Sequence, residues 1–317
     1  MKSSKSNPTF LITGGAGFIG SNTCDLLLNQ DCNLIVIDNL STGSLENIKH
    51  IKNKIVFYNS SIEEFDFNLV DKIDIVIHLA AQTSVPLSIK NFYLSSKSNL
   101  LTSLKVLDFC SIRKIPLIYA SSSAIYGDLD TGDDETSSND LLSPYSADKL
   151  TLETFSRMIF KLNNIPSIGL RFFNVYGPRQ DPDSAYSGVI SIFAKQIINN
   201  KPIKINGGKQ TRDFIFVNDV TKCIYNSYEI LKKNNICETV NVLSNRSTSI
   251  DDLANLMMKI IGKYPEKIYK PLSKGDPLKS IGSFRKMERI FQISMNEITE
   301  LEKGLIETVN YLKKEKN

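Results

Sequence analysis

A short apolar run that leads directly into regularly spaced glycines constrains the fold of this chain more than any other segment. Residues 9–13 read TFLIT, and Gly14, Gly17 and Gly20 follow within GGAGFIG, ahead of a helical pattern at 21–29. Glycines at this spacing allow a tight turn, close approach of the backbone to a pyrophosphate, and close packing of the helix on the strand. The helix N-terminus adds amide groups and a positive dipole. The order strand, glycine loop, helix therefore predicts a parallel α/β sheet that binds a dinucleotide.

The next apolar run indicates which dinucleotide would bind. Residues 33–38 read NLIVID and end in Asp38, eighteen residues after Gly20. A carboxylate at this place is suited to hydrogen-bond the ribose hydroxyls of the adenosine. It favours NAD over NADP, because a 2′-phosphate would meet a negative charge, and residues 39–43 contain no arginine. An aspartate that only caps a turn is the alternative interpretation.

The alternation of strands and helices continues along most of the chain. The patterns predict strands at 55–59, 74–81, 115–127 and 165–178, with helices at 92–112 and 144–163. After residue 178 they predict helices at 186–200 and 249–262, strands at 202–205 and 239–244, and an extended segment at 212–220 that becomes a helix. We expect an α/β protein: a Rossmann-like doubly wound parallel sheet (1–176 plus 221–243) with a smaller, discontinuous α/β substrate-binding lobe (177–220 plus 244–317).

Composition excludes several other functions. The 38 Lys and Arg residues are spread along the chain, which does not indicate nucleic-acid binding. No apolar run reaches the length of a membrane span, and the polar N-terminus MKSSKSNP lacks the apolar region of a signal peptide, so we expect a cytoplasmic protein. Five scattered cysteines indicate reduced packing residues. With only His50 and His78, no metal site is expected and little room is left for a histidine triad.

Three polar features lie among the predicted elements. His78 falls inside the apolar run 74–81, which favours a hydrogen-bonded core histidine over a reactive one. A serine cluster, 121–123, ends a predicted strand, where ligands of parallel sheets bind; a polar strand end that caps the next turn is the alternative. The acidic loop 128–140 is expected to be solvated. Asn99 falls within the predicted helix 92–112, on either a buried or an exposed face.

Tyr145 and Lys149 are the candidate base and its activator. Ser143 is suited to cap a helix and Pro144 to begin it, so positions 145 and 149 would share one helix face. A tyrosine has a pKa of about 10 and is a poor base at neutral pH. A fixed cation beside it favours the phenolate and lowers that pKa. The spacing alone also occurs by chance, as a surface tyrosine next to a solvated lysine.

Taken together, the motifs resemble the extended short-chain dehydrogenase/reductase family, and within it the NAD-dependent nucleotide-sugar 4-epimerases. The segments that carry the resemblance are TGGAGFIG (13–20), DNLSTG (38–43), IHLAAQTSV (77–85), SSSAIYG (121–127), SPYSADK (143–149), LRFFNVYGPRQ (170–180), AYSGVISIF (185–193) and TRDFIFVNDV (211–220). The resemblance implies that Tyr145 removes the proton of the sugar 4-hydroxyl, that hydride passes from C4 to NAD and returns to the other face, and that Lys149 and Ser122 assist.

The resemblance also assigns residues to the two ligands. Those expected to contact NAD are Gly14, Gly17, Phe18, Ile19, Gly20, Asp38, Asn39, Ser41, Gly43, Ser61, Ile62, Leu79, Ala80, Ala81, Asn99, Tyr145, Lys149 and Phe173. Those expected to contact a UDP-sugar are Ser84, Ser122, Ser123, Tyr145, Asn174, Gly188, Val189, Asn206, Arg212, Asp276 and Ser280. The guanidinium of Arg212 is expected on the diphosphate.

Differences within the family favour one reaction. Dehydratases and decarboxylases of this fold carry an acid beside the bridging hydroxyl, and 3,5-epimerases often carry a cysteine there, whereas Ser122 is followed by Ser-Ala-Ile. Simple 4-epimerisation is therefore favoured. A small residue at Ser280, where a bulky tyrosine limits related sites to plain hexoses, favours interconversion of UDP-N-acetylglucosamine and UDP-N-acetylgalactosamine, with UDP-glucose and UDP-galactose as a further pair. Polysaccharide biosynthesis is the expected setting.

Some alternatives stay open. Ser61 stands where the family often has aspartate, and the R-x-G-D pattern, whose arginine grips the diphosphate, reads Ser273-Lys274-Gly275-Asp276. The nearest rivals are a UDP-uronate 4-epimerase, acting on UDP-glucuronate or UDP-N-acetylglucosaminuronate, and a nucleotide-sugar dehydratase or decarboxylase. A non-catalytic NAD-binding sensor is a rival of another class, although it would not need a tyrosine base. Family dimers imply a homodimer in which helices 92–112 and 144–163 form a four-helix bundle.

Overall fold

The strand–glycine–helix unit at the start of the chain forms β1 (Thr9–Thr13), α1 (Phe18–Leu28) and β2 (Asn33–Asp38). The computed structural model describes residues 7–136, 138–184, 187–272 and 277–314. Helix α1 begins three residues before the predicted start at residue 21. Gly20 lies in its first turn, where an added Cβ would lie 2.1 Å from the carbonyl oxygen of Gly14. The missing side chain therefore lets the helix start directly against the glycine loop.

Seven strands form one parallel sheet in the described ranges. Its further members are β3 (Ile55–Asn59), β4 (Ile75–His78), β5 (Leu117–Ser122), β6 (Ser167–Phe172) and β10 (Cys237–Val242), in the order β10-β6-β5-β4-β1-β2-β3. Strand β1 pairs with β2 on one side and β4 on the other. The strand order reverses there, and ligands of doubly wound sheets bind at the carboxyl ends of strands beside such a reversal. The predicted Rossmann-like sheet is confirmed.

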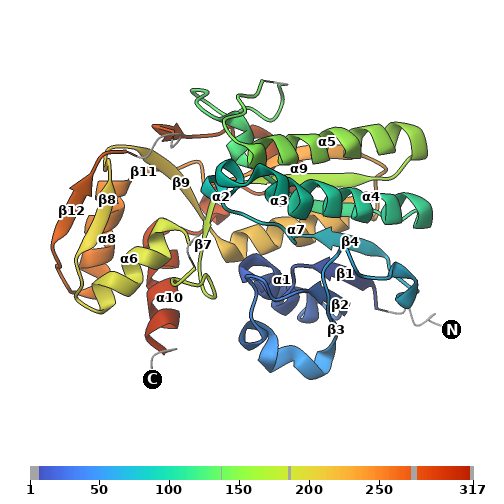
Figure 1. Cartoon of the computed structure of the whole chain (residues 1–317), viewed down its shortest axis with the longest axis horizontal. Helices are drawn as coiled ribbons and strands as arrows, with labels where there is room; N and C mark the ends of the chain where they lie inside the picture. Colours follow the sequence, from blue (N-terminus) through green and yellow to red (C-terminus); the bar gives the residue numbers. More distant parts are fainter. Residues whose placement is uncertain (1–6, 137, 185–186, 273–276, 315–317) are drawn as a thin grey trace. The chain divides into compact units, whose positions relative to one another are not determined.

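In the described residues, α2 (Val85–Lys90), α3 (Phe92–Ser96) and α4 (Thr102–Arg113) lie between β4 and β5, and α5 (Pro144–Asn163) lies between β5 and β6. Figure 1 shows α3 and α4 in line with one another and α5 lying alongside both. A π-helical turn, Lys97–Leu101, joins α3 to α4, so the predicted helix 92–112 exists as one helical segment with a wider turn inside it. Such turns are often found at functional sites. Helix α5 occupies the predicted range.

Several predicted boundaries are wrong by a few residues. The strand expected at 74–81 ends at His78, because the amide of Ala80 donates to the Thr13 hydroxyl instead of continuing the ladder. The strand expected at 115–127 gives way after Ser122 to a 3-10 helix. The helix expected at 186–200 is α6 (Val189–Ile198), and the extended segment 212–220 ends where α7 (Val217–Leu231) begins. Asp219 in the first turn of α7 favours the helix through its dipole.

The chain divides into two compact units. The first unit comprises Met1–Ser121, Ser143–Leu170 and Thr221–Thr239, and the second comprises Ser122–Leu142, Arg171–Val220 and Val240–Asn317. The boundaries expected from the sequence placed residues 122–142 with the sheet, whereas this division groups them with the second unit. The expected separation into two domains stays a prediction.

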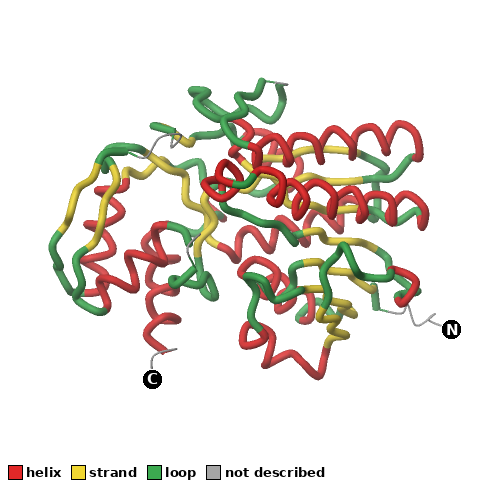
Figure 2. The backbone as a smooth tube through the Cα atoms, viewed as in Figure 1, coloured by secondary structure: helices red, strands yellow, loops and turns green. Residues whose placement is uncertain are grey.

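The second unit surrounds smaller sheets with helices. Strand β9 (Thr211–Phe216) pairs with β7 (Asn174–Tyr176), β11 (Ser247–Ser249) and β13 (Lys279–Ser280), and β8 (Ile203–Asn206) pairs with β12 (Lys267–Lys270). Helices α6, α8 (Ile250–Ile261), α9 (Arg285–Phe291) and α10 (Leu301–Lys314) complete it. Figure 2 shows α6 and α8 beside the β8–β12 pair. Ser249 caps α8 as predicted, because its hydroxyl accepts from the amide of Asp252 at 3.0 Å.

The core of the first unit joins neighbouring strands to the helices that cover them. Leu11, Val76 and Leu117 from β1, β4 and β5 pack with Val106 of α4 and Leu152 of α5. Burial of this apolar surface is the main stabilising term for such a layer. In the described residues the five cysteines are free thiols, no three His, Cys, Asp or Glu side chains are grouped to hold a metal ion, and no helix is long and apolar enough to cross a membrane.

Candidate active site

The glycine loop is packed too closely to carry side chains. Gly14 has a φ of +73°, and an added Cβ there would lie 2.7 Å from the amide nitrogen of Ala80. Its own amide donates to the carbonyl oxygen of Ile37 at 2.8 Å. Gly14 and Gly20 are therefore required by backbone geometry, and the loop presents main-chain atoms rather than side chains to a ligand.

The N-terminus of α1 is suited to an anionic group. Its N-cap is Gly17, which has no side chain to cap the helix, and the first turn holds no acidic residue. Helices α5 and α8, by contrast, are capped by the hydroxyls of Ser143 and Ser249. The first amides of a helix have no partner within the helix, and together with the dipole they attract negative charge. The predicted contacts Phe18 and Ile19 lie in this turn, so the loop fits a pyrophosphate.

Asp38 ends β2 with its carboxylate held by the backbone. One oxygen, Oδ2, accepts from the amide of Ala16 at 2.9 Å, and Oδ1 accepts from the amide of Leu40 at 2.8 Å. Burial raises the pKa of this carboxyl group, and the backbone hydrogen bonds oppose that rise. Carboxylate oxygens carry further lone pairs, so the group can still accept from two ribose hydroxyls. Together with the glycine loop, Asp38 fits NAD, with Asn39, Ser41 and Gly43 directly beyond it.

Asn99 is buried and clamps the loop that follows β4. From the π-helical turn its Oδ1 accepts from the amide of Gln82 at 2.7 Å, and its Nδ2 donates to the carbonyl of Gln82 at 3.0 Å. Of the two faces that the sequence allowed for Asn99, the buried one is therefore correct. The clamp fixes the backbone just after Leu79, Ala80 and Ala81, three predicted cofactor contacts. Ile62 is buried in the loop after β3, with Ser61 beside it.

His78 is a core histidine with both ring nitrogens engaged, as predicted, although it lies at the end of β4 and not inside the strand. Ser103 Oγ donates to the carbonyl of Asn99 at 2.5 Å and thus accepts from His78 Nε2 at 2.9 Å, so the other nitrogen, Nδ1, accepts from the Thr13 hydroxyl at 2.7 Å. Burial lowers the pKa of His78 to about 3, and the ring is neutral at physiological pH. A neutral ring fixed in this way orders the strand end but carries no proton in the reaction.

Tyr145 and Lys149 lie on one face of α5, as predicted. Ser143 and Ser146 form a capping box ahead of them, and Pro144 occupies the first turn. Both are buried, at 9% and 6% exposure, so neither is a solvated surface group. The ammonium lies 5.7 Å from the centre of the Tyr145 ring and donates to the carbonyl of Ala120 at 2.8 Å. Burial lowers the pKa of Lys149 to about 8, and nearby carboxylates oppose the decrease.

The serine cluster at the end of β5 divides into separate roles. Ser122 caps the 3-10 helix Ser123–Tyr126, since its hydroxyl oxygen accepts from the amide of Ala124 at 3.1 Å. Its own proton is still available to a ligand. Ser121 donates instead to Glu153 on α5 at 2.5 Å. Glu153 is completely buried and was not among the predicted site residues, although it lies four residues beyond Lys149 on the same helix face.

The second unit contains a cavity of about 320 Å³ that is open to solvent on one side. Five predicted substrate contacts line it: Asn174, Gly188, Val189, Asn206 and Arg212. Sequence reasoning missed the other lining residues, among them the polar side chains of Gln180, Lys204 and Gln210. Lys204 alternates with the buried Ile203 and Ile205 on β8, a period that could have indicated it, whereas Gln210 lies in the loop just before β9, where no local signal indicated it. The residues that line the cavity include two cations and no carboxylate in the described chain, which suits an anionic ligand.

The remaining predicted contacts are distributed over several elements. Ser84 caps α2, and Phe173 is buried between β6 and β7. Ser280 lies in β13 opposite Arg212 of β9, so these two residues are neighbours in the strand register. Asp276 lies outside the described residues, as do Ser273 and Lys274 of the altered diphosphate pattern.

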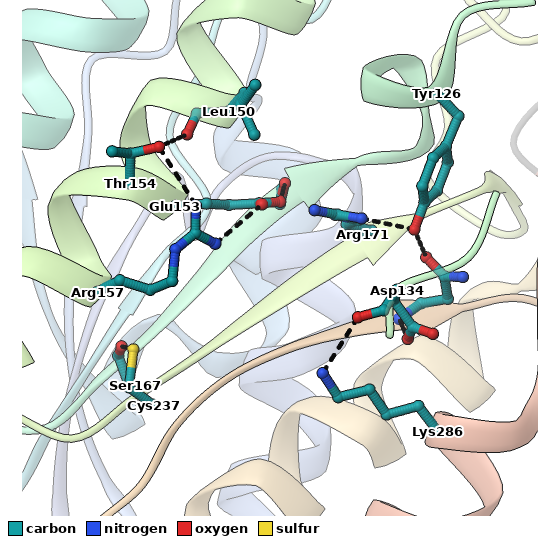
Figure 3. Close-up of polar contacts among 12 residues, drawn as sticks. Tyr126, Asp134, Leu150, Glu153, Thr154, Arg157, Ser167, Arg171, Cys237 and Lys286 are labelled. Atoms are coloured by element: carbon teal, nitrogen blue, oxygen red, sulfur yellow. Dashed lines mark hydrogen bonds and ion pairs between the residues drawn. The ribbon is translucent and has the colours of Figure 1, made fainter. Parts of the chain in front are cut away.

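The loop 128–140 was expected to be solvated, and for Asp134 this is wrong. Its Oδ2 accepts from the amide of Asn241 at 2.6 Å, and its carbonyl accepts from Lys286 at 3.3 Å. Arg171 donates to the hydroxyl of Tyr126 at 2.6 Å, which in turn donates to Asn241 at 2.7 Å; Figure 3 shows these contacts. Burial raises the pKa of Asp134. The cluster anchors the loop inside the second unit, because its charged members have partners.

Comparisons with known proteins agree with this arrangement. Residues 10–242 match the NAD dependent epimerase/dehydratase family. A putative UDP-glucose 4-epimerase of Methanocaldococcus jannaschii is 34% identical, covering 96% of this chain and 98% of the relative. The UDP-N-acetylglucosamine 4-epimerase of Methanobrevibacter ruminantium M1, solved with UDP-N-acetylmuramic acid, has a TM-score of 0.92 at 30% identity, covering 98% and 100% of the two chains.

A third similar protein was solved with both ligands. The UDP-glucuronic acid 4-epimerase of Bacillus cereus, in complex with UDP-glucuronic acid and NAD, has a TM-score of 0.88 at 32% identity, covering 96% of this chain and 99% of that one. The family match covers well over half of the chain, and the glycine loop, Asp38 and the Tyr145–Lys149 pair described above lie within it. This chain therefore belongs to the NAD dependent epimerase/dehydratase family.

Proposed function

We propose that this chain is an NAD-dependent 4-epimerase of UDP-sugars. The observation that carries the proposal is the geometry of α5, where a buried ammonium lies 5.7 Å from the centre of a buried tyrosine ring. A solvated or purely structural pair would not hold a cation in this place at the cost of its hydration. A non-catalytic sensor of NAD would need the glycine loop and Asp38 but not this pair.

The residues of the chain would divide the chemistry among them. Tyr145, as the phenolate, takes the proton of the sugar 4-hydroxyl and later returns one to the same oxygen. The ammonium of Lys149 stabilises the phenolate electrostatically. The hydroxyl of Ser122 donates to the sugar oxygen and orients it. Bound NAD supplies the hydride acceptor at sugar C4 and, after the keto sugar has turned, the hydride donor to its other face.

The cavity of the second unit supports a nucleoside diphosphate as the group that anchors the sugar. Arg212 is almost completely buried, and a guanidinium matches the geometry of phosphate oxygens. Asn174 and Asn206 supply amides that can recognise a base or a ribose. The cavity volume is at the lower end for ligand pockets, in keeping with a site for the nucleotide portion alone.

Among UDP-sugars we propose UDP-N-acetylglucosamine and UDP-N-acetylgalactosamine as the preferred pair, with UDP-glucose and UDP-galactose accepted. The small side chain of Ser280 supports this preference, because it leaves room for an acyl group next to Arg212 in the strand register. A UDP-uronate is the second candidate. The similar Bacillus cereus structure, whose ligand is UDP-glucuronic acid, favours it.

We also propose a homodimer formed by the α3–α4 segment and α5. Large apolar side chains are exposed on these helices in the first unit: Phe92, Tyr93, Leu101, Ile112, Met158 and Leu162. Large exposed apolar side chains on neighbouring helices are typical of a protein interface, and pairing two helices from each copy would give a four-helix bundle. Sedimentation at micromolar concentration should give the mass of a dimer, and a monomer would contradict the proposal.

Substrate incubations followed by proton NMR test the proposed reaction. Purified protein with NAD is given UDP-N-acetylglucosamine, UDP-glucose, UDP-glucuronate or UDP-N-acetylglucosaminuronate in separate tubes. We expect the anomeric signal of the 4-epimer in the first tube, a slower conversion in the second, and none with Tyr145→Phe. Fastest conversion of a uronate would replace the preferred substrate by the second candidate. No epimer in any tube would contradict 4-epimerisation of these UDP-sugars.

A further inference from the structure

Glu153 follows Tyr145 and Lys149 at the same helical spacing. The three residues occupy positions i, i+4 and i+8 of α5, so they form a row along one face of the helix. All three are buried, and Glu153 is 0% exposed. An ionised carboxylate is almost never fully buried without partners. Specific partners must therefore hold Glu153, which takes no part in the proton or hydride transfer proposed above.

Glu153 is hydrogen-bonded to β5, the same strand to which Lys149 is hydrogen-bonded. Its Oε1 accepts from the hydroxyl of Ser121 at 2.5 Å, and the ammonium of Lys149 donates to the carbonyl of Ala120 at 2.8 Å. Ala120 and Ser121 are consecutive residues of β5, so two successive turns of α5 are bound to two successive residues of one strand. These bonds fix the position of the helix along the strand.

The second oxygen of Glu153 lies near a guanidinium. Arg157 Nη1 is 3.8 Å from Oε2, one further turn along α5, and Figure 3 shows the pair together with the bond from Arg157 to Thr154. About half of the Arg157 side chain is exposed, so water screens its charge. The ammonium of Lys149 is the buried positive charge of this row.

We propose that Glu153 is a positioning residue for Lys149: its buried carboxylate keeps the ammonium in place and protonated, so that the Tyr145–Lys149 pair stays active at mildly alkaline pH. This inference rests on the proposed function of that pair. It follows from electrostatics, because a buried charge is costly unless an opposite charge compensates it. Burial disfavours the charged form of Lys149, and two carboxylates favour it, first Asp148 and then Glu153.

Asp148 is a second carboxylate that favours the ammonium of Lys149, with a larger effect than Glu153. Asp148 is the neighbour of Lys149 in sequence, lies on a different helix face and is hydrogen-bonded to Ser96 and Asn99, whereas Glu153 is bound to β5 next to the carbonyl that holds Lys149. His78 is neutral and contributes no charge at physiological pH. Tyr119 of β5, on which Glu153 acts, has its pKa raised well above the working range by burial and also stays neutral.

Glu153→Gln tests the proposal, because glutamine keeps the size and can still accept from Ser121 while the charge is lost. Without the carboxylate, Lys149 loses its proton at lower pH. We expect the alkaline limb of the pH profile of kcat/KM to move to lower pH by about one unit. Activity near pH 7 should change less than about threefold, and activity near pH 9 should fall about tenfold. Glu302→Gln, an exposed charge change on α10, should leave the profile unmoved. A profile lowered equally at all pH values, or left unchanged, would overturn the proposal.

Unfolding provides a readout that does not depend on activity. Lys149 binds its proton less tightly in the folded chain than the usual lysine, so stability rises with pH between about 8 and the usual pKa of 10.5. Glu153→Gln should increase the free-energy cost of keeping Lys149 charged in the folded chain. We therefore expect the variant to melt below the wild type at pH 7 and to approach it at pH 9.5. An equal difference at both pH values would overturn the proposal, even if no UDP-sugar proved to be a substrate.

Discussion

The glycine loop and α5 of the first unit differ from the cavity of the second unit in how their residues are brought together. In the first unit the contacts come from one turn and one helix, so residues close in sequence are close in space. The cavity collects side chains from β7, α6, β8 and β9, which span residues 174 to 216. Local spacing therefore predicts the first arrangement well, whereas only tertiary structure reveals the members of the second.

The largest effect is expected from the helix face of α5. Tyr145→Phe removes the phenol that acts as the base and should lower kcat by about 10²–10⁴-fold, with little change in the melting temperature. Tyr264→Phe, which removes the hydroxyl of an exposed tyrosine in the loop after α8, is the matched control and should retain full activity. Steady-state kinetics would decide. If Tyr145→Phe kept kcat within a few-fold of wild type, this face of α5 would not supply the catalytic base.

The glycine loop should come next. At Gly20 an added Cβ would lie 2.1 Å from a backbone oxygen, so Gly20→Ala must displace the loop or α1. We expect the affinity for NAD, measured by calorimetry, to fall by at least about a hundredfold, since the backbone can no longer approach the pyrophosphate.

Gly262→Ala separates this effect from glycine loss in general. Gly262 has a φ of +74°, but an added Cβ there would have no neighbouring atom within 4 Å, so alanine should cost about 1 kcal/mol of stability and no NAD affinity. Equal NAD affinity for Gly20→Ala and Gly262→Ala would contradict the proposed role of the loop.

Substitutions in the cavity of the second unit should have a smaller effect, and the loss of UDP affinity should be larger for Arg212 than for Lys204. Arg212→Met should weaken binding of UDP about tenfold to a hundredfold, because a buried charged hydrogen bond contributes about 1.5–3 kcal/mol. Lys204→Met should weaken it about threefold or less, because Lys204 is exposed and water screens its charge. Titration calorimetry with UDP gives both values. Equal losses of UDP affinity in the two variants, or no loss in either, would show that the cavity does not hold the diphosphate through Arg212.

His78 should give the smallest effect, and only in acid. Its pKa is lowered to about 3 in the folded chain from a usual value of 6.5, so the unfolded chain binds the proton more readily between these values. Stability is therefore lost as pH falls below about 6.5. Relative to His78→Gln, the free energy of unfolding of the wild type should decrease by about 1.4 kcal/mol per pH unit from pH 6 to pH 4. If denaturant titrations gave free energies of unfolding that change with pH in the same way for the wild type and for His78→Gln, His78 would not be held neutral in the folded chain.

The same comparison explains what the sequence could predict. The cap Ser143, the first residue Pro144 and the apolar period fixed α5 to the residue, because these signals are local. The start of α1 was missed, because it depends on how closely Gly20 approaches Gly14. Asp134 has acidic neighbours in sequence, and nothing local indicated that Asn241 and Lys286 would bury it. Glu153 was passed over because its partner Ser121 is 32 residues away.

The fate of hydrogen at sugar C4 tests the central claim most directly. Purified protein with NAD is given UDP-N-acetylglucosamine, or the fastest substrate found, carrying deuterium at C4, in ordinary water. Transient oxidation at C4 with return of the same hydride predicts that both epimers at equilibrium keep the deuterium at C4, as read by mass spectrometry and proton NMR. Replacement of the label by hydrogen from water during epimerisation would contradict the account, because the proton would then have been exchanged at carbon without hydride transfer.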